Sequence, residues 1–160
     1  MATINASFSL SSDITDYGMS ISKNMTMTKA GSTTGLDKAT GLIRKTFTST
    51  NHVDLLVGAA SGGIAEDVTK NSSAKLYIKN VSTDSSEYFT IGMGKSSGSS
   101  SEEGFDQASS TERYCQIGRL YGGDWMLIPW DAEDTNGYGD ITIQPSVATT
   151  MVAEYMVFFE

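Results

Sequence analysis

The stretch Ile117–Trp130, IGRLYGGDWMLIPW, decides the fold of this chain. It contains both tryptophans and one of the two prolines, on either side of a Gly-Gly-Asp sequence. Glycine tolerates positive φ, so Gly122 and Gly123 predict a tight reversal of the chain. The apolar run Trp125–Trp130 is short and bounded by turn signals, which predicts a strand buried on both faces. Because Pro129 has no N–H for a ladder, we expect pairing to stop there.

These features together predict a hairpin in the core of the protein. Trp125 and Trp130 are its expected anchors, since aromatic side chains bury more area than other side chains. An alternative is that one of the two lies at an interface between subunits. The stretch contains no catalytic group.

Alternating apolar and polar residues predict further strands on both sides of this stretch. Residues 3–10 and 18–28 alternate with a period of two, which predicts two half-buried strands. Similar patterns predict strands at residues 41–50, 75–80, 87–93, 111–118, 141–144 and 150–160, with 52–57 either extending the first of these or forming a short strand of its own. The strands at 75–80 and 87–93 are expected to pair as a hairpin across a short turn.

The number of strands and the scarcity of helical periodicity predict the fold class. About nine or ten short strands separated by turns are typical of an all-β protein, a β-sandwich, jelly roll or barrel. The 160 residues show no internal repeat and no domain boundary, so we expect one β-sandwich domain spanning 1–160. The low-complexity segment 95–110, KSSGSSSEEGFDQASS, lacks apolar periodicity and predicts a flexible loop that proteases cut first.

Composition argues against several classes of partner. A net charge of −8 and a pI of about 4.5 do not suit a nucleic-acid groove or an anionic membrane. Serine and threonine account for 22 and 18 of the 160 residues, which favours strands and turns over surface helices. The single cysteine, Cys115, cannot form an intrachain disulfide, which fits production in a reducing cytoplasm. We expect neither a signal peptide nor a membrane span, because no long apolar run is present.

Motifs for catalysis are incomplete. The run IGMGKS at residues 91–96 ends like a phosphate loop, but Phe89 occupies the position of the required first glycine. His52 and Cys115 are each the sole residue of their type, too few for a zinc site without carboxylates. We expect Cys115 to be a buried or half-buried structural residue. The chain is therefore predicted not to be an enzyme, with no catalytic residue, cofactor or metal site.

The acidic turn 131–140, DAEDTNGYGD, leaves calcium binding open. Its carboxylate and amide oxygens are the ligands that calcium takes. The spacing does not match the helix-flanked calcium loop, and a solvated turn is the usual meaning of this composition.

The closing strand is apolar on both faces. One face carries Val152, Glu154, Met156 and Phe158; the other carries Met151, Ala153, Tyr155, Val157 and Phe159. One face is predicted to pack in the core and the other to be covered by a loop or a neighbouring subunit. We expect Glu154 to pair with Arg44, Arg113, Arg119 or a lysine. The candidate interface residues are Trp125, Trp130, Glu154, Tyr155, Phe158 and Phe159.

Four segments, three of them in the second half, resemble small structural proteins of tailed-phage virions, of the kind found in marine and cyanobacterial phages. They are KLYIKN at 75–80, IGRLYGGDW at 117–125, IPW at 128–130 and ITIQPS at 141–146. The first half resembles these proteins more loosely, from Ser11 to Lys45, and the insert 95–110 departs from their compact pattern. The resemblance implies a β-sandwich that builds or decorates the particle, and it carries over no catalytic residue.

The function that this resemblance implies is that of a capsid decoration (cement) protein. Such a protein is made in the host cytoplasm, binds the outer surface of the major capsid protein lattice and stabilises it. By the same analogy we expect a homotrimer. The alternatives are a tail, neck or fibre component of the virion, or a carbohydrate-binding β-sandwich that stacks sugars on Trp125 or Trp130.

Overall fold

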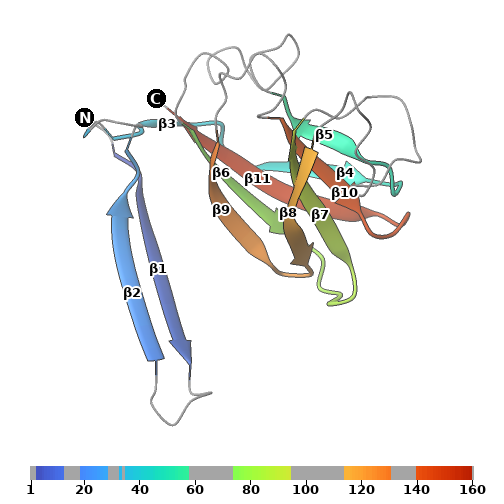
Figure 1. Ribbon diagram of the computed structural model, residues 1–160, viewed down its shortest axis with the longest axis horizontal. Helices are drawn as coiled ribbons and strands as arrows, with labels where there is room; N and C mark the ends of the chain where they lie inside the picture. Colours follow the sequence, from blue (N-terminus) through green and yellow to red (C-terminus); the bar gives the residue numbers. More distant parts are fainter. Residues whose placement is uncertain are drawn as a thin grey trace.

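The computed structural model describes residues 3–12, 19–28, 33, 35–57, 74–94, 114–130 and 140–159. These residues form eleven strands in three antiparallel sheets (Figure 1). Two sheets make a sandwich, and the third is a two-stranded arm that stands beside it. The predicted all-β class is confirmed, with slightly more strands than expected.

The sandwich has a larger and a smaller sheet. In the larger sheet the order is β4 (Ile43–Phe47), β11 (Met151–Phe159), β6 (Ala74–Asn80) and β9 (Trp125–Trp130), and the short β3 (Lys38–Ala39) also pairs with β11. In the smaller sheet the order is β5 (Val53–Leu56), β10 (Ile141–Pro145), β7 (Tyr88–Gly94) and β8 (Tyr114–Tyr121).

The order of the strands is that of a jelly roll. If β4 is counted as the first of eight, the larger sheet holds strands one, eight, three and six. The smaller sheet holds strands two, seven, four and five. This interleaving is the double Greek key that defines the jelly roll. The jelly-roll form of the predicted fold is therefore confirmed.

Both predicted hairpins of the second half are wrong. β6 and β7 lie in different sheets, and so do β8 and β9. Each of these links carries the chain from one sheet to the other. Gly123 has a φ of 87°, which confirms the predicted positive φ at the turn, although the turn joins two sheets. A Cβ at Gly122 would collide with the carbonyl oxygen of Asp84, so the β6–β7 loop packs directly on this turn.

The core lies between the two sheets and follows the alternation of the sequence. Leu76 and Ile78 of β6 face Ile91, Ile141 and other residues of the smaller sheet, and all four are fully buried. Across the core, the rings of Phe47 and Phe89 meet edge to face with their centroids 5.3 Å apart. The prediction for the inner face of the closing strand is confirmed, because Met151, Ala153, Tyr155, Val157 and Phe159 all belong to this core.

The prediction that Trp125–Trp130 is buried on both faces is wrong. β9 is the edge strand of the larger sheet, and only one of its faces meets the core. Trp130 is 3% exposed on the inner face, whereas Trp125 is 53% exposed on the outer face. Pairing also continues through Pro129, which lies opposite Lys75. An edge strand tolerates proline because its outer N–H groups have no ladder to complete.

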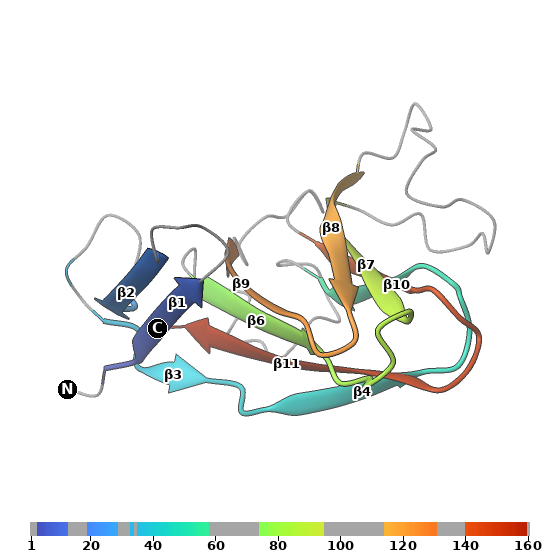
Figure 2. The same cartoon turned by 90° about the horizontal axis from the view of Figure 1, so that it is seen from below.

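The arm consists of β1 (Asn5–Ser12) and β2 (Met19–Thr26) and projects from the sandwich beside β3 (Figures 1 and 2). Its base is fixed by backbone hydrogen bonds. The N–H of Ile4 donates to the oxygen of Leu36 over 3.2 Å, and the N–H of Leu36 donates to the oxygen of Met27 over 2.8 Å. Met27 and Leu36 are buried there. The predicted half-burial of both strands is wrong beyond this base, because the arm belongs to neither sheet of the sandwich.

Two predictions fall largely on residues that the structure does not describe. The flexible loop 95–110 lies wholly outside the described residues. The acidic turn lies outside them except for Asp140, whose carbonyl oxygen accepts a hydrogen bond from the N–H of Gly94 over 2.8 Å.

Candidate interaction surface

The described residues offer no cluster of polar side chains suited to metal binding. Within these ranges, no three His, Cys, Asp or Glu side chains are grouped as a metal site requires. The same ranges contain no helix that is both long enough and apolar enough to cross a membrane. Cys115 is exposed on β8, so its predicted burial is wrong. His52 precedes β5 at the opposite edge of that sheet, so the fold keeps the two residues apart.

The arm has one apolar face and one polar face. The strand register places Ala6 opposite Met25, Phe8 opposite Lys23, Leu10 opposite Ile21, and Ser12 opposite Met19 on the first face. The second face holds only serine, asparagine and threonine, in the pairs Asn5–Thr26, Ser7–Asn24, Ser9–Ser22 and Ser11–Ser20. The large residues of the apolar face are exposed between 39% and 52%. The arm therefore presents to solvent the kind of surface that proteins normally bury.

The outer face of the larger sheet carries a second apolar surface. Trp125 and Leu127 point outward from β9, beside Tyr77 of β6 and near Phe158 of β11. The rings of Tyr77 and Trp125 lie with their centroids 6.3 Å apart. Partial burial, and then the negative charge of Glu154, raise the pKa of the Tyr77 hydroxyl, so this hydroxyl stays neutral at physiological pH.

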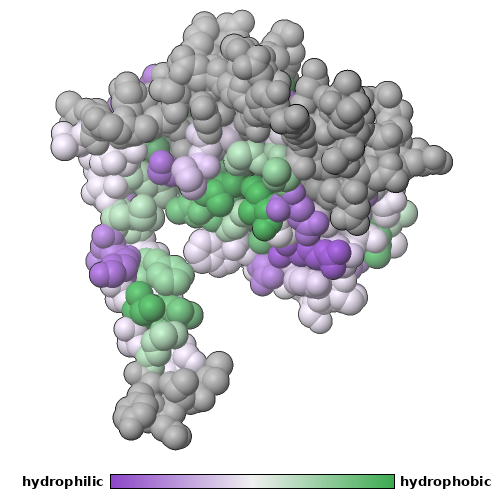
Figure 3. Space-filling model, in the orientation of Figure 1, coloured by the Kyte–Doolittle hydropathy of each residue, from purple (hydrophilic) through white to green (hydrophobic). Residues whose placement is uncertain are grey.

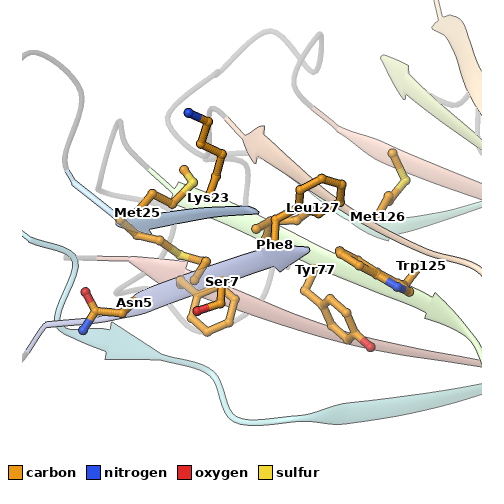
Figure 4. A pocket seen from close by; sticks show the side chains of 12 residues that line it. Asn5, Ser7, Phe8, Lys23, Met25, Tyr77, Trp125, Met126 and Leu127 are labelled. Carbon is orange, nitrogen blue, oxygen red and sulfur yellow. The ribbon is translucent and has the colours of Figure 1, made fainter. Parts of the chain in front are cut away.

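These two surfaces face each other across a cleft of about 640 Å³. Its lining comes from the base of the arm, mainly Ala6, Phe8, Lys23, Met25 and Met27, and from the sheet, mainly Tyr77, Trp125, Met126, Leu127 and Phe158. Figure 3 shows apolar residues on the arm and on the body bordering the space between them. Figure 4 shows Phe8, Leu127, Tyr77 and Trp125 around this space. Among its described lining residues, the cleft combines aromatic and aliphatic side chains with one cation, Lys23.

Five of the six predicted interface residues divide into two groups. Trp130, Tyr155 and Phe159 are core residues and are not available to a partner. Phe158 and Trp125 line the cleft, and Trp125 is the most exposed of the six.

The sixth residue, Glu154, lies on the outer face but is only 8% exposed. Its Oε2 accepts a hydrogen bond from Nε of Arg44 over 2.9 Å. The predicted ion pair of Glu154 is therefore confirmed, with Arg44 as the partner. The two residues are direct neighbours in the β4–β11 register, so the pair supports this strand pairing.

Sequence reasoning missed the arm residues as part of the surface. The signal was present: apart from Lys23, every second residue of 5–12 and 19–26 is apolar or small, and nearly all the others are serine or asparagine. That alternation indicates that one face is covered, but it does not indicate whether the cover comes from the same chain.

No protein-family model matches the chain, and no curated protein sequence matches it. Among solved structures, the chain is similar to the crystal structure of the Yersinia pseudotuberculosis-derived mitogen, with a TM-score of 0.37 and 12% sequence identity over 77% of this chain and 86% of that chain. A TM-score of this size does not establish a shared fold.

Proposed function

We propose that this chain is a structural protein of a virion, and that it decorates the capsid as a cement protein. The observation that carries the proposal is the arm, whose apolar face stands outside the sandwich and is exposed. Burial of apolar surface provides roughly 25 cal/mol per Å², so a projecting apolar arm is a means of holding neighbouring subunits together. The resemblance of segments 75–80, 117–125, 128–130 and 141–146 to tailed-phage virion proteins supports the same role.

The remaining physical properties suit an outer position on a particle. The chain carries a net charge of −8, which disfavours contact with packaged nucleic acid. The sandwich is closed by an extensive apolar core and needs no disulfide, so it can form in a reducing cytoplasm before assembly. The proposed partners are the major capsid protein and further copies of this chain, with three copies as the proposed number.

Copy number in purified particles tests this proposal. We expect quantitative mass spectrometry of intact virions to find the chain at a fixed ratio to the major capsid protein, and cryo-electron microscopy to place it on the outer lattice. A low copy number confined to one end of the particle would instead identify a tail, neck or fibre component. Absence from purified virions would contradict both roles.

A second candidate function rests on Trp125. An exposed tryptophan beside a tyrosine, with ring centroids 6.3 Å apart, is a platform on which a sugar ring can stack. If the chain is a carbohydrate-binding module, glycan-array binding should be detectable and should be lost in Trp125→Ala. The matched control is Tyr121→Ala, which removes another exposed aromatic at the edge of the smaller sheet.

A further inference from the structure

We propose that the open edge of β9 binds an extended segment of another protein, which joins the larger sheet as a further strand. The segment lies in the cleft between β9 and the base of the arm, and its backbone pairs with residues 125–128. Its side chains over this stretch are uncharged and largely apolar. The proposal does not depend on the virion role, because it concerns only how the edge of a sheet is covered.

The first argument is that one edge of β9 has no strand to pair with. Among the described residues, β9 pairs only with β6. The N–H of Asn80, at the end of β6, donates to the carbonyl oxygen of Asp124 over 3.0 Å. Backbone groups alternate in direction along an antiparallel strand, so Met126 also points its N–H and C=O toward β6. Trp125 and Leu127 therefore point theirs toward the open edge.

The second argument is that this edge lacks the protection that the other edges have. Proteins block strand edges with charged side chains, because an uncovered apolar edge pairs with other chains. Every other edge strand of the sandwich carries at least one charge: Lys38 in β3, Arg44 and Lys45 in β4, Asp54 in β5 and Arg119 in β8. β9, with the sequence WMLIPW, carries none. Its residues before the proline thus have the composition of a strand that a partner covers.

The third argument is that the cleft has the size and the lining for one extended chain. Met126 packs against the core and yet lines the cleft, so the cleft reaches around the open edge of β9 (Figure 4). Phe8 and Met25 of the arm form part of the opposite wall. A residue in a packed strand occupies roughly 160 Å³, given the spacings along a strand, between strands and between sheets. The cleft of about 640 Å³ therefore has room for about four residues, as many as β9 offers before Pro129.

These features together select a single extended segment as the occupant. A helix bonds its own backbone groups internally and would leave those of the β9 edge without partners. Every described strand of a second copy brings a paired neighbour about 4.8 Å away, and a space for about four residues does not hold two strands. A lone strand pairs with β9 and places alternate apolar side chains against Leu127 on one side and Phe8 of the arm on the other.

Peptide selection with matched variants tests this strand addition. We expect the folded chain to enrich, from a random library of short peptides, sequences with about four consecutive uncharged residues rich in valine, isoleucine and threonine. Leu127→Pro removes an outward N–H but keeps the pairing with β6, since Pro129 occupies the same kind of position. It should bind the enriched peptides about tenfold more weakly than Leu127→Ala, which retains the N–H. No enrichment of such peptides, or equal affinity of the two variants, would overturn the proposal and leave the virion role standing.

Amide hydrogen exchange in the wild-type chain tests the same pairing without a substitution. An enriched peptide should slow exchange at the N–H groups of Trp125 and Leu127 by at least about tenfold, because each gains a hydrogen bond. It should leave Met126 unchanged, because that N–H already points toward β6. Protection of Trp125 and Leu127 in the chain alone would show that its own residues or a second copy cover this edge. Peptide binding without protection would show that only side chains make contact, and either result would overturn the proposal.

Methylation of the peptide backbone tests whether the peptide binds as a strand. Alternate residues of a paired strand direct their N–H groups to opposite edges. N-methylation of one alternate set of residues should therefore abolish binding, while N-methylation of the other set should leave the affinity unchanged. Equal effects of the two methylated peptides would show that the peptide does not pair with β9 along one edge, which would contradict strand addition.

Discussion

At the scale of single residues, Asn80 holds the crossing between the two sheets. Its side chain is fully buried, and its Nδ2 donates to the carbonyl oxygens of Leu120 and Glu87 over 3.0 and 3.2 Å. Its Oδ1 accepts from the N–H of Ser82 over 3.0 Å. Its backbone N–H donates to the carbonyl oxygen of Asp124 over 3.0 Å, which joins the end of β6 to the turn before β9. One amide side chain thus connects both links that replace the two predicted hairpins.

Replacement of Asn80 should therefore destabilise the whole sandwich. Asn80→Ala leaves one buried carbonyl oxygen, one part-buried carbonyl oxygen and one N–H without this partner, and we expect a loss of about 3 kcal/mol in the free energy of unfolding. Asn80→Asp should be at least as harmful, because it turns a carboxylate oxygen toward those two carbonyl oxygens. Urea denaturation measures both changes, with Thr83→Ala in the exposed loop as the control. A loss in Asn80→Ala no larger than in the control would refute this role.

The two tryptophans should differ sharply in their contribution to stability. Trp130 is buried in the core, and Trp130→Ala should cost about 3–5 kcal/mol. Trp125 is exposed, and Trp125→Ala should cost less than about 1 kcal/mol in the dilute protein. Denaturant titration followed by far-ultraviolet circular dichroism gives both values. Similar losses in the two variants would show that Trp125 is covered in the single chain.

At the scale of elements, the arm and the sandwich differ in what holds them together. Among the described residues, β1 and β2 pair only with each other, whereas β11 pairs with β4 on one edge and β6 on the other and contributes five residues to the core. Local opening is easiest where few apolar contacts and many exposed hydrogen bonds occur together.

Hydrogen exchange should separate these elements. In dilute solution we expect the amides of β1 and β2 to exchange much faster than those of β6 and β11, because the arm opens without disruption of the core. Mass spectrometry of peptides covering 5–26 and 151–159 provides the comparison. Equal protection of the two peptides in the dilute wild-type chain would contradict an independent arm.

At the scale of the whole molecule, stability should depend on pH through His52. Burial lowers the pKa of this imidazole below its ordinary 6.5, and the charge of Asp54 only partly opposes this effect. The unfolded chain therefore binds a proton at a higher pH than the folded chain. The resulting stability is fully present above pH 6.5 and is lost as the pH falls through 6.5 toward the folded pKa.

Thermal melting on both sides of pH 6.5 checks this dependence. We expect the melting temperature to fall between about pH 8 and about pH 5.5, a window above the titration of ordinary carboxyl groups. His52→Gln should flatten the curve in this window, since glutamine does not titrate. A wild-type curve that is equally flat would show that the imidazole pKa does not differ between the folded and unfolded chains.

The sequence by itself determined the all-β class and the positions of most strands. A period of two is local, so it also identified which residues of the closing strand share a face. The predicted partners of Glu154 were all 11 basic residues of the chain, and the β4–β11 register selected Arg44 among them. The positive φ at the Gly-Gly turn was likewise a local property of glycine.

Only the tertiary structure decided which sheet each strand joins. Alternation specifies the faces of a strand but not its neighbours, because pairing depends on residues far away in the chain. β6 and β7 are close in sequence, yet β6 lies between β11 and β9 in one sheet while β7 lies between β10 and β8 in the other. The same long-range pairing makes β9 an edge strand, which buries Trp130 and exposes Trp125. It also leaves β1 and β2 paired only with each other, so that an apolar face typical of a covered strand becomes the exposed face of an arm.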